Sequence, residues 1–281
     1  MKTILCPTDF STNAGNATEY ACAFAAKLNA RIILFHAYES PAAYTENEIA
    51  ISHDVEKMLK EKVSAKLEAL AKKLGKKYSG VTFETQYANG TGADETISAA
   101  NRNDADMIIM GTTGTSKLER LLMGSTTSKV LANAECPVLC VPGDAEFMDI
   151  RKIVFATDLN EDNISSAMTI APFAMQFGAE IIFVFVDDKH LIHSDEEINK
   201  MTRKIRTHVS YPKIAGYISK NTSVTKGIEY FLKKYPADIL VMFTHHKHFP
   251  ETLFNQSLTR IMSHQTNIPL LALKVSDRPV I

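Results

Sequence analysis

The sequence predicts an α/β protein in which two tandem domains each contain an open sheet of five parallel strands. Three observations predict this fold class. The chain has 281 residues, a length that suits two domains. Short apolar runs rich in Ile and Val alternate with helical segments, as in βαβ units. The second half of the chain also repeats the pattern of the first half, as a duplicated unit would.

The repeat begins with the first predicted strand of each half. Residues 3–10, TILCPTDF, match residues 152–159, KIVFATDL, at an offset of 149. Both are apolar runs that contain Thr-Asp near their end. Further along the chain a second constant offset of 132 takes over, as for Thr112 with Thr244. Two copies of one ancestral unit explain these matches.

The change of offset also locates a deletion. Because the offset falls from 149 to 132, the second copy lacks 17 residues between these stretches. We expect the loss opposite residues 45–77, a Lys- and Glu-rich amphipathic helix whose charges form a solvated face. A Pro-Gly-Asp sequence at 142–144 predicts the boundary. The expected domains are residues 1–143 and 150–281.

The elements of the first copy follow from its apolar pattern, taken in chain order. Apolar runs bounded by turn residues predict strands, and segments with three- and four-residue apolar spacing predict helices. Strands separated by helices in this way indicate parallel pairing in a doubly wound sheet. The predicted strands cover about residues 2–8, 31–37, 81–87, 106–111 and 137–141, and the predicted helices about residues 13–28, 47–77, 92–103 and 124–133.

Composition and charge exclude several classes of protein. With 45% hydrophobic residues, 22% charged residues and a formal net charge of −1, the chain is typical of a globular protein. It lacks the basic character of a protein that wraps DNA. The N-terminal residues do not resemble a secretory signal, and no run of about 18 apolar residues predicts a membrane span. We therefore expect a cytoplasmic protein with no nucleic-acid and no membrane partner.

The four cysteines all lie in the first half of the chain. Cys136 and Cys140 stand on either side of Pro137 in a strand-like run. Cysteine is frequently buried as a small apolar residue, and disulfides are rare in the cytosol. The sequence therefore predicts reduced thiols in the core rather than disulfides or a zinc site.

A glycine pattern follows the strand predicted at 106–111. Gly111 and Gly114 stand at the strand exit, and Gly124-Ser125-Thr126 opens the next helix, in the spacing G-x2-G-x9-G-S. Glycine allows the backbone to turn and to approach a ligand closely. A helix N-terminus offers free N–H groups and the positive end of its dipole to phosphate oxygens. The same pattern also fits a glycine turn followed by an ordinary Ser/Thr helix cap.

Asp9 and Ala37 end two other predicted strands. Ligands of doubly wound sheets bind beyond the carboxyl ends of the strands, so Asp9, Ala37 and the glycine loop are expected to converge on one nucleotide. There the Asp9 carboxylate would accept hydrogen bonds from ribose hydroxyls or an exocyclic amine. The alternative is that Asp9 serves as a helix cap near Ser11.

The opening TILCPTDFS, the segment GTTGTSKLERLLMGSTTSKV and the closing CPVLCVP together resemble the universal stress protein family in its tandem two-domain form. The resemblance covers essentially the whole chain. It implies Rossmann-like domains of the kind that bind ATP with a divalent cation, expected to be Mg²⁺. By the family pattern, the adenine and ribose end would be held by Asp9 and the backbone at Ala37. The ribose and phosphates would be surrounded by Gly111, Gly114, Gly124, Ser125 and Thr126.

The resemblance also implies self-association. Family members pair their last strands, so CPVLCVP and IPLLALK are expected to pair edge to edge within this chain, as an internal pseudo-dimer. Such pairing would remove two exposed strand edges.

The second half departs from the nucleotide motif. At the constant offset, Phe243, His246 and Gln256 stand where Gly111, Gly114 and Gly124 stand in the first half. Side chains at these positions would obstruct the close backbone approach that a triphosphate needs. We expect that the second domain, whose motif is degenerate, does not bind ATP in the manner of the family.

The same stretch carries several histidines. His245, His246 and His248, with Glu251 nearby, are candidate ligands for zinc, or contacts for an anion when protonated. The alternative is a polar loop that has diverged after losing its nucleotide.

No catalytic residues are assigned, because the sequence lacks the common nucleotidase, hydrolase and metalloprotease motifs. We expect a stress-response protein whose first domain binds ATP as a regulatory or structural ligand, with slow hydrolysis or none. One alternative is a scaffold, or a metal- or small-ligand-binding module, that uses the loop at His245–His248. Another is an α/β enzyme that uses ATP.

Overall fold

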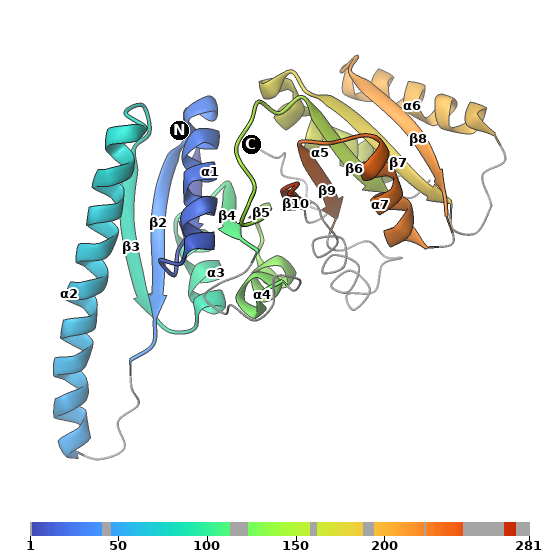
Figure 1. The fold of residues 1–281 in the computed structure, drawn as a ribbon. Helices are drawn as coiled ribbons and strands as arrows, with labels where there is room; N and C mark the ends of the chain where they lie inside the picture. Colours follow the sequence, from blue (N-terminus) through green and yellow to red (C-terminus); the bar gives the residue numbers. More distant parts are fainter. Residues whose placement is uncertain are drawn as a thin grey trace. The chain divides into compact units, whose positions relative to one another are not determined.

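The computed structural model describes residues 2–40, 46–112, 123–157, 162–187, 194–221, 223–243 and 267–273. The chain separates into two compact units, which, apart from residues 118–123, comprise residues 1–143 and 144–281. Figure 1 shows the strands and helices of both. We describe each unit by itself.

The first unit contains a five-stranded parallel sheet with strand order β3-β2-β1-β4-β5. Helices alternate with these strands along the chain, as the sequence predicts. The elements in chain order are β1 (Thr3–Pro7), α1 (Thr12–Leu28), β2 (Arg31–Tyr38), α2 (Glu46–Lys77), β3 (Phe83–Asn89), α3 (Gly92–Arg102), β4 (Met107–Gly111), α4 (Ser125–Asn133) and β5 (Val138–Val141).

The second unit repeats this arrangement with strand order β10-β9-β6-β7-β8, again with parallel pairing. The predicted fold class, two tandem α/β units with parallel sheets, is confirmed. The elements in chain order are β6 (Lys152–Thr157), α5 (Asp162–Phe177), β7 (Glu180–Asp187), α6 (Asp195–Val209), β8 (Ile214–Lys220), α7 (Val224–Lys234), β9 (Ile239–Phe243) and β10 (Leu270–Leu273).

Strand registers follow the sequence repeat. Ile4 pairs with Ile32 and with Met107, and at offsets of 149 and 132 Ile153 pairs with Ile181 and Ile239. The length difference falls where the sequence predicts it, since α2 has 32 residues and α6 has 15, a difference of 17. In their described residues, the two units are therefore copies of one fold, and this helix accounts for the 17-residue difference.

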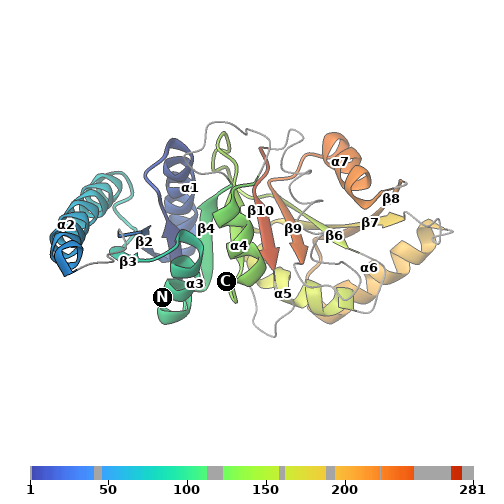
Figure 2. The same ribbon diagram turned by 90° about the horizontal axis from the view of Figure 1, so that it is seen from below.

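The sheets are buried on both faces, which explains their uninterrupted apolar strands. In β2, consecutive side chains from Ile32 to Phe35 are at most 1% exposed although they point alternately to opposite faces. In Figure 2, α1 covers one face of the first sheet while α3 and α4 cover the other, and α7 lies opposite α5 and α6 in the second unit. The apolar core of each unit thus consists of two layers, one on each side of its sheet.

One predicted boundary is displaced. The strand predicted at 81–87 lies at Phe83–Asn89, although Val81 is apolar and buried. The Val81 N–H donates to the carbonyl of Tyr78, 3.0 Å away, in the turn that leaves α2. The turn that leaves α2 thus still includes Val81, and the ladder with β2 begins where the Ile32 N–H donates to the Thr82 carbonyl at 2.8 Å.

All four cysteines are free, as the sequence predicts, and three of them are buried. Burial raises the pKa of Cys6 to about 11, of Cys140 to about 12 and of Cys136 to about 11, and it also raises the pKa of Cys22. Loss of water around a thiolate disfavours the charged form. At neutral pH these thiols are protonated.

Two helical glycines provide a matched test of core packing. A Cβ at Gly227 of α7 would lie 2.5 Å from Val186 Cγ1, whereas a Cβ at Gly15 of α1 would have no atom within 4 Å. We expect Gly15→Ala to raise the free energy of unfolding by about 0.5–1 kcal/mol through helix propensity. We expect Gly227→Ala to lower it by about 1–3 kcal/mol through overlap with a stiff side chain. Urea unfolding of both variants checks this, and a Gly227→Ala protein as stable as the wild type would contradict it.

Candidate functional site

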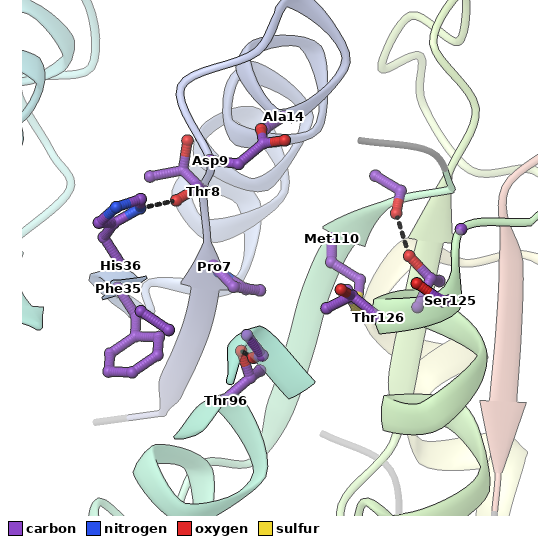
Figure 3. A pocket seen from close by; sticks show the side chains of 15 residues that line it. Pro7, Thr8, Asp9, Ala14, Phe35, His36, Thr96, Met110, Ser125 and Thr126 are labelled. Atoms are coloured by element: carbon purple, nitrogen blue, oxygen red, sulfur yellow. Dashed lines mark hydrogen bonds between the residues drawn. The ribbon is translucent and has the colours of Figure 1, made fainter. Parts of the chain in front are cut away.

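A cavity of about 300 Å³ lies in the first unit at the carboxyl ends of β1, β2 and β4. The N-terminal turns of α3 and α4 complete its wall. Figure 3 shows Thr8, Asp9 and His36 on one side of this cavity and Ser125 and Thr126 on the other. A position beyond the carboxyl ends of parallel strands is where ligands bind in doubly wound folds.

The cavity brings together the predicted site residues that the structure describes. They are Asp9, Ala37, Gly111, Gly124, Ser125 and Thr126. Gly114, the seventh predicted residue, lies outside the described residues. The strand ends therefore converge as the sequence predicts, while the part that each residue plays toward a nucleotide remains a prediction.

The loop after β1 is held by its own side chains. The exposed Asp9 accepts a hydrogen bond at Oδ1 from the Ser11 N–H, 2.9 Å away, and Thr8 Oγ1 accepts one from the Phe10 N–H at 3.0 Å. The N-cap of α1 is Ser11, whose side chain accepts from the Ala14 N–H. Ser11, and not Asp9, therefore caps the helix. The hydrogen bond from the Ser11 N–H instead holds the Asp9 carboxylate in a local turn beside the cavity.

His36 fixes the same loop from β2. Its Nδ1 lies 2.7 Å from the Thr8 carbonyl oxygen, and because a carbonyl only accepts, Nδ1 must carry the proton. The His36 ring lies against the Phe10 ring, with centroids 4.8 Å apart. The Phe10 ring also contacts Lys66, whose Nζ lies 5.0 Å from the ring centroid. Phe10 has a φ of 62°, a backbone conformation that is costly for a bulky residue. These contacts hold the Thr8-Asp9 turn in one conformation.

The start of α4 is suited to an anion. Gly124 is the N-cap, with extended backbone and no side-chain cap hydrogen bond, and its N–H donates to the Thr112 carbonyl at 2.8 Å. Thr127 Oγ1 donates to the Gly111 carbonyl at 2.9 Å, which fastens the helix to the end of β4. Ser125 and Thr126 are exposed. The first turn therefore presents backbone N–H groups, two hydroxyls and the positive end of the helix dipole to the cavity.

A second helix begins at the same cavity. Gly92, the first residue of α3, lies beside Thr126, because a Cβ on Gly92 would be 3.5 Å from Thr126 Cγ2. Thr96, one turn later, also lines the cavity, and its Oγ1 donates to the Gly92 carbonyl at 2.6 Å. The sequence reasoning missed Gly92, Thr96 and His36. The run Asn-Gly-Thr-Gly at 89–92, at the end of a predicted strand, was the available signal for Gly92.

The cavity has little formal charge. Its titratable lining residues are Asp9 and His36, and no Lys or Arg is among the described residues that line it. Backbone N–H groups, hydroxyls and two helix N-termini are thus the groups here that could stabilise negative charge.

The corresponding positions in the second unit carry larger apolar side chains. At the observed strand and helix registers, His36 and Ala37 correspond to Phe185 and Val186, and Gly111 corresponds to Phe243. Gly92 and Thr96 correspond likewise to Val224 and Ile228. Phe185, Ile228 and Phe243 are all buried, and the Phe243 ring packs edge-on against Phe155 at 5.4 Å. At these described positions, buried apolar side chains therefore stand where the first unit has cavity-lining residues.

Other candidates from the sequence fall outside the described residues. These are His245, His246 and His248, with Glu251, and also Gln256, the counterpart of Gly124. Among the residues that are described, no group of three or more His, Cys, Asp or Glu side chains is placed to hold a metal ion. In the same part of the chain, no helix combines the length and apolar character needed to cross a bilayer.

Comparison with known proteins gives one consistent result. Residues 1–142 match the model of the universal stress protein family. A universal stress protein of Methanocaldococcus jannaschii is 34% identical over 141 residues, which are 50% of this chain and 81% of that protein. One of Thermus aquaticus is 37% identical over 144 residues, which are 50% of this chain and 98% of that protein.

A solved structure matches both halves at once. The crystal structure of a universal stress protein from Archaeoglobus fulgidus covers 98% of this chain, which covers 97% of that one, with a TM-score of 0.71 and 20% identity. This similarity shows that both units share the fold. With the family model matching just over half of its residues, the chain belongs to the universal stress protein family.

Proposed function

We propose that the first unit binds ATP, together with Mg²⁺, as a regulatory or structural ligand of a cytoplasmic stress-response protein. The observation that carries this proposal is the 300 Å³ cavity on which the ends of three parallel strands and the N-termini of α3 and α4 converge. Its volume lies at the lower end of ligand sites, which measure roughly 300–1,000 Å³.

Each side of the cavity suits one part of the nucleotide. The Asp9 carboxylate and the backbone at Ala37 would contact the adenine and ribose, with the loop held in place by His36. Gly111, Gly124 and the hydroxyls of Ser125 and Thr126 would contact the ribose and phosphates, and on sequence grounds Gly114 belongs to this group. Mg²⁺ would be held mainly by phosphate oxygens and water, because it keeps most of its water shell in such sites.

The nucleotide acts in this proposal as a ligand rather than a substrate. Phosphoryl transfer needs a positioned nucleophile and groups that stabilise charge on the transferred phosphate. Of the described lining residues, Asp9 is assigned in this proposal to the base and ribose, and the His36 Nδ1 proton is engaged by the Thr8 carbonyl. We therefore expect slow hydrolysis or none, and regulation through a ligand-bound state that is more stable than the free one.

The second unit has a different part in this proposal. The buried apolar residues Phe185, Ile228 and Phe243 stand at positions equivalent to His36, Thr96 and Gly111, which supports the expectation that this unit has no ATP site of the same kind. We infer that this unit serves as a structural partner for the first and is free to carry another ligand.

The phosphate side is tested by Gly124→Val. The added side chain would project from the N-cap of α4, where the phosphates are proposed to lie, so we expect Mg-ATP to bind at least about tenfold more weakly, a loss of about 1.4 kcal/mol. Isothermal titration calorimetry measures this. Gly80→Val is the matched control, because a Cβ at Gly80 has no atom within 4 Å and the residue lies away from the cavity. Equal affinity for Mg-ATP in the wild type, Gly124→Val and Gly80→Val would contradict the assignment of the phosphate site.

The base and ribose side is tested by Asp9→Asn. This nearly isosteric change keeps an oxygen for the Ser11 N–H and removes the charge. We expect ATP to bind with an affinity lower by about 1.5–3 kcal/mol, the range for hydrogen bonds to a charged group. Titration with adenosine, whose binding should weaken in parallel, assigns the loss to this side, whereas unchanged adenosine affinity would contradict the role of Asp9.

The stoichiometry of binding tests the difference between the units. We expect one Mg-ATP per wild-type chain, and in Gly124→Val a single site weakened at least about tenfold. A stoichiometry of two in the wild type, with one site of unchanged affinity left in Gly124→Val, would contradict this expectation and assign a nucleotide to the second unit. Parallel titrations with AMP and cyclic AMP establish which adenine nucleotide the first unit prefers.

A further inference from the structure

A second cavity, of about 380 Å³, runs along the outer edge of the second unit. Its lining residues come from β8 and the residue after it, from the last turns of α7, and from the first residue of α6. β8 is the last strand of its sheet, as Figure 1 also shows. This groove lies within the second unit and is separate from the site proposed for ATP.

One wall of the groove is aromatic. The rings of Tyr217, Phe231 and Tyr235 form a closed triangle, with centroids 5.5 Å, 5.4 Å and 4.9 Å apart. Tyr217 is 39% exposed and Tyr230, which also lines the groove, is 61% exposed. Rings that pack against one another at these distances are fixed in place, and their exposed surface is suited to stacking with a flat ligand.

The groove also carries more positive than negative charge. Lys220 and Lys234 line it together with one carboxylate, Asp195, which gives a formal charge of +1. Lys234 Nζ lies 5.4 Å from the centroid of the Tyr235 ring, so a cation stands directly beside the aromatic wall. A flat ring stacked on this wall would bring an attached anionic group within reach of a lysine.

The first unit has no such wall at the matching place. In the shared register, Tyr217 corresponds to Gln86, Phe231 to Ala99 and Tyr235 to Asn103. There the Gln86 and Asn103 side chains exchange two hydrogen bonds of 2.9 Å, so that each amide both donates to and accepts from the other. One copy of the fold therefore closes this edge with a small amide pair, and the other places three rings around an open groove.

We propose that this groove is a binding site for a small planar aromatic molecule that bears an anionic group. The exposed rings of Tyr217 and Tyr230 take the flat ring, the buried Phe231 holds Tyr217 in place, and Lys220 and Lys234 take the anion. This site goes beyond the function proposed for the first unit and does not depend on it. A nucleoside monophosphate and an aromatic carboxylate share this chemistry and are separated by the experiment.

The test is equilibrium dialysis of the full chain against three probes. Naphthalenesulfonate is planar and anionic, naphthalenemethanol is planar and neutral, and methanesulfonate is anionic without a ring. We expect saturable binding of naphthalenesulfonate at one site per chain and at least tenfold weaker binding of the other two. Equal binding of naphthalenemethanol, or no saturable binding of naphthalenesulfonate, would overturn the proposal.

Matched variants locate the probe. Lys234→Met and Tyr230→Ser, both at exposed positions, should each weaken naphthalenesulfonate binding at least fivefold. Lys233→Met, the neighbouring exposed lysine outside the groove, and Tyr87→Ser, a 40% exposed tyrosine of the first unit, should leave it unchanged. If both groove variants bind as the wild type does, the site is not this groove.

The Gly124→Val variant separates this proposal from that for ATP. Naphthalenesulfonate should bind Gly124→Val as it binds the wild type, and loss of binding would assign the probe to the first unit and overturn the proposal. In this background, displacement of the probe by AMP identifies a nucleoside phosphate as the ligand class. Displacement by naphthoate and not by AMP identifies an aromatic carboxylate.

Discussion

In a parallel sheet every strand points in the same direction, and this constraint determines most of what the protein presents at its surface. All strands of the first unit have their carboxyl ends at the same end of the sheet, and β2, β1 and β4 are neighbours. The turns after these three strands must therefore lie side by side. The helices that follow begin at that same end of the sheet, and the N–H groups of their first turns have no partner within the helix. Backbone N–H groups and polar side chains are therefore concentrated at the carboxyl end of a sheet whose faces are buried. The cavity beside Asp9 and Gly124 lies at this end.

The two units show how one backbone can carry different side chains at equivalent places. Strand register is shared residue for residue, as the pairs of Ile4 and Ile153 show. The first unit has Gly92 and Gly111 beside its cavity, and the second has Val224 and Phe243 at the matching described positions. At the outer strand the difference is reversed, with an amide pair in the first unit and a ring triangle in the second. Duplication thus left the framework unchanged while the side chains at its edges diverged.

Features set by periodicity and by the repeat were predictable from the sequence. The order of strands and helices, the 17-residue difference between α2 and α6, and the convergence of Asp9, Ala37 and Gly124 all follow from local patterns combined with the geometry of parallel sheets. The contact of His36 with Thr8 was not predictable, because it joins residues 28 positions apart through a side chain. The start of β3 also depends on where the turn after α2 ends, with the hydrogen bond from Val81 to Tyr78, which hydropathy does not reveal.

The protonated cysteines have a consequence for how the molecule can be observed. Alkylating reagents and peroxide attack the thiolate, and with a pKa of about 11 only about one Cys6 side chain in ten thousand is ionised at pH 7. Cys22 and Cys140 are enclosed in the same core and share this inertness. Reaction at these three sulfurs must therefore wait for the first unit to open, so the rate at which they are alkylated measures the frequency of that opening without any introduced label.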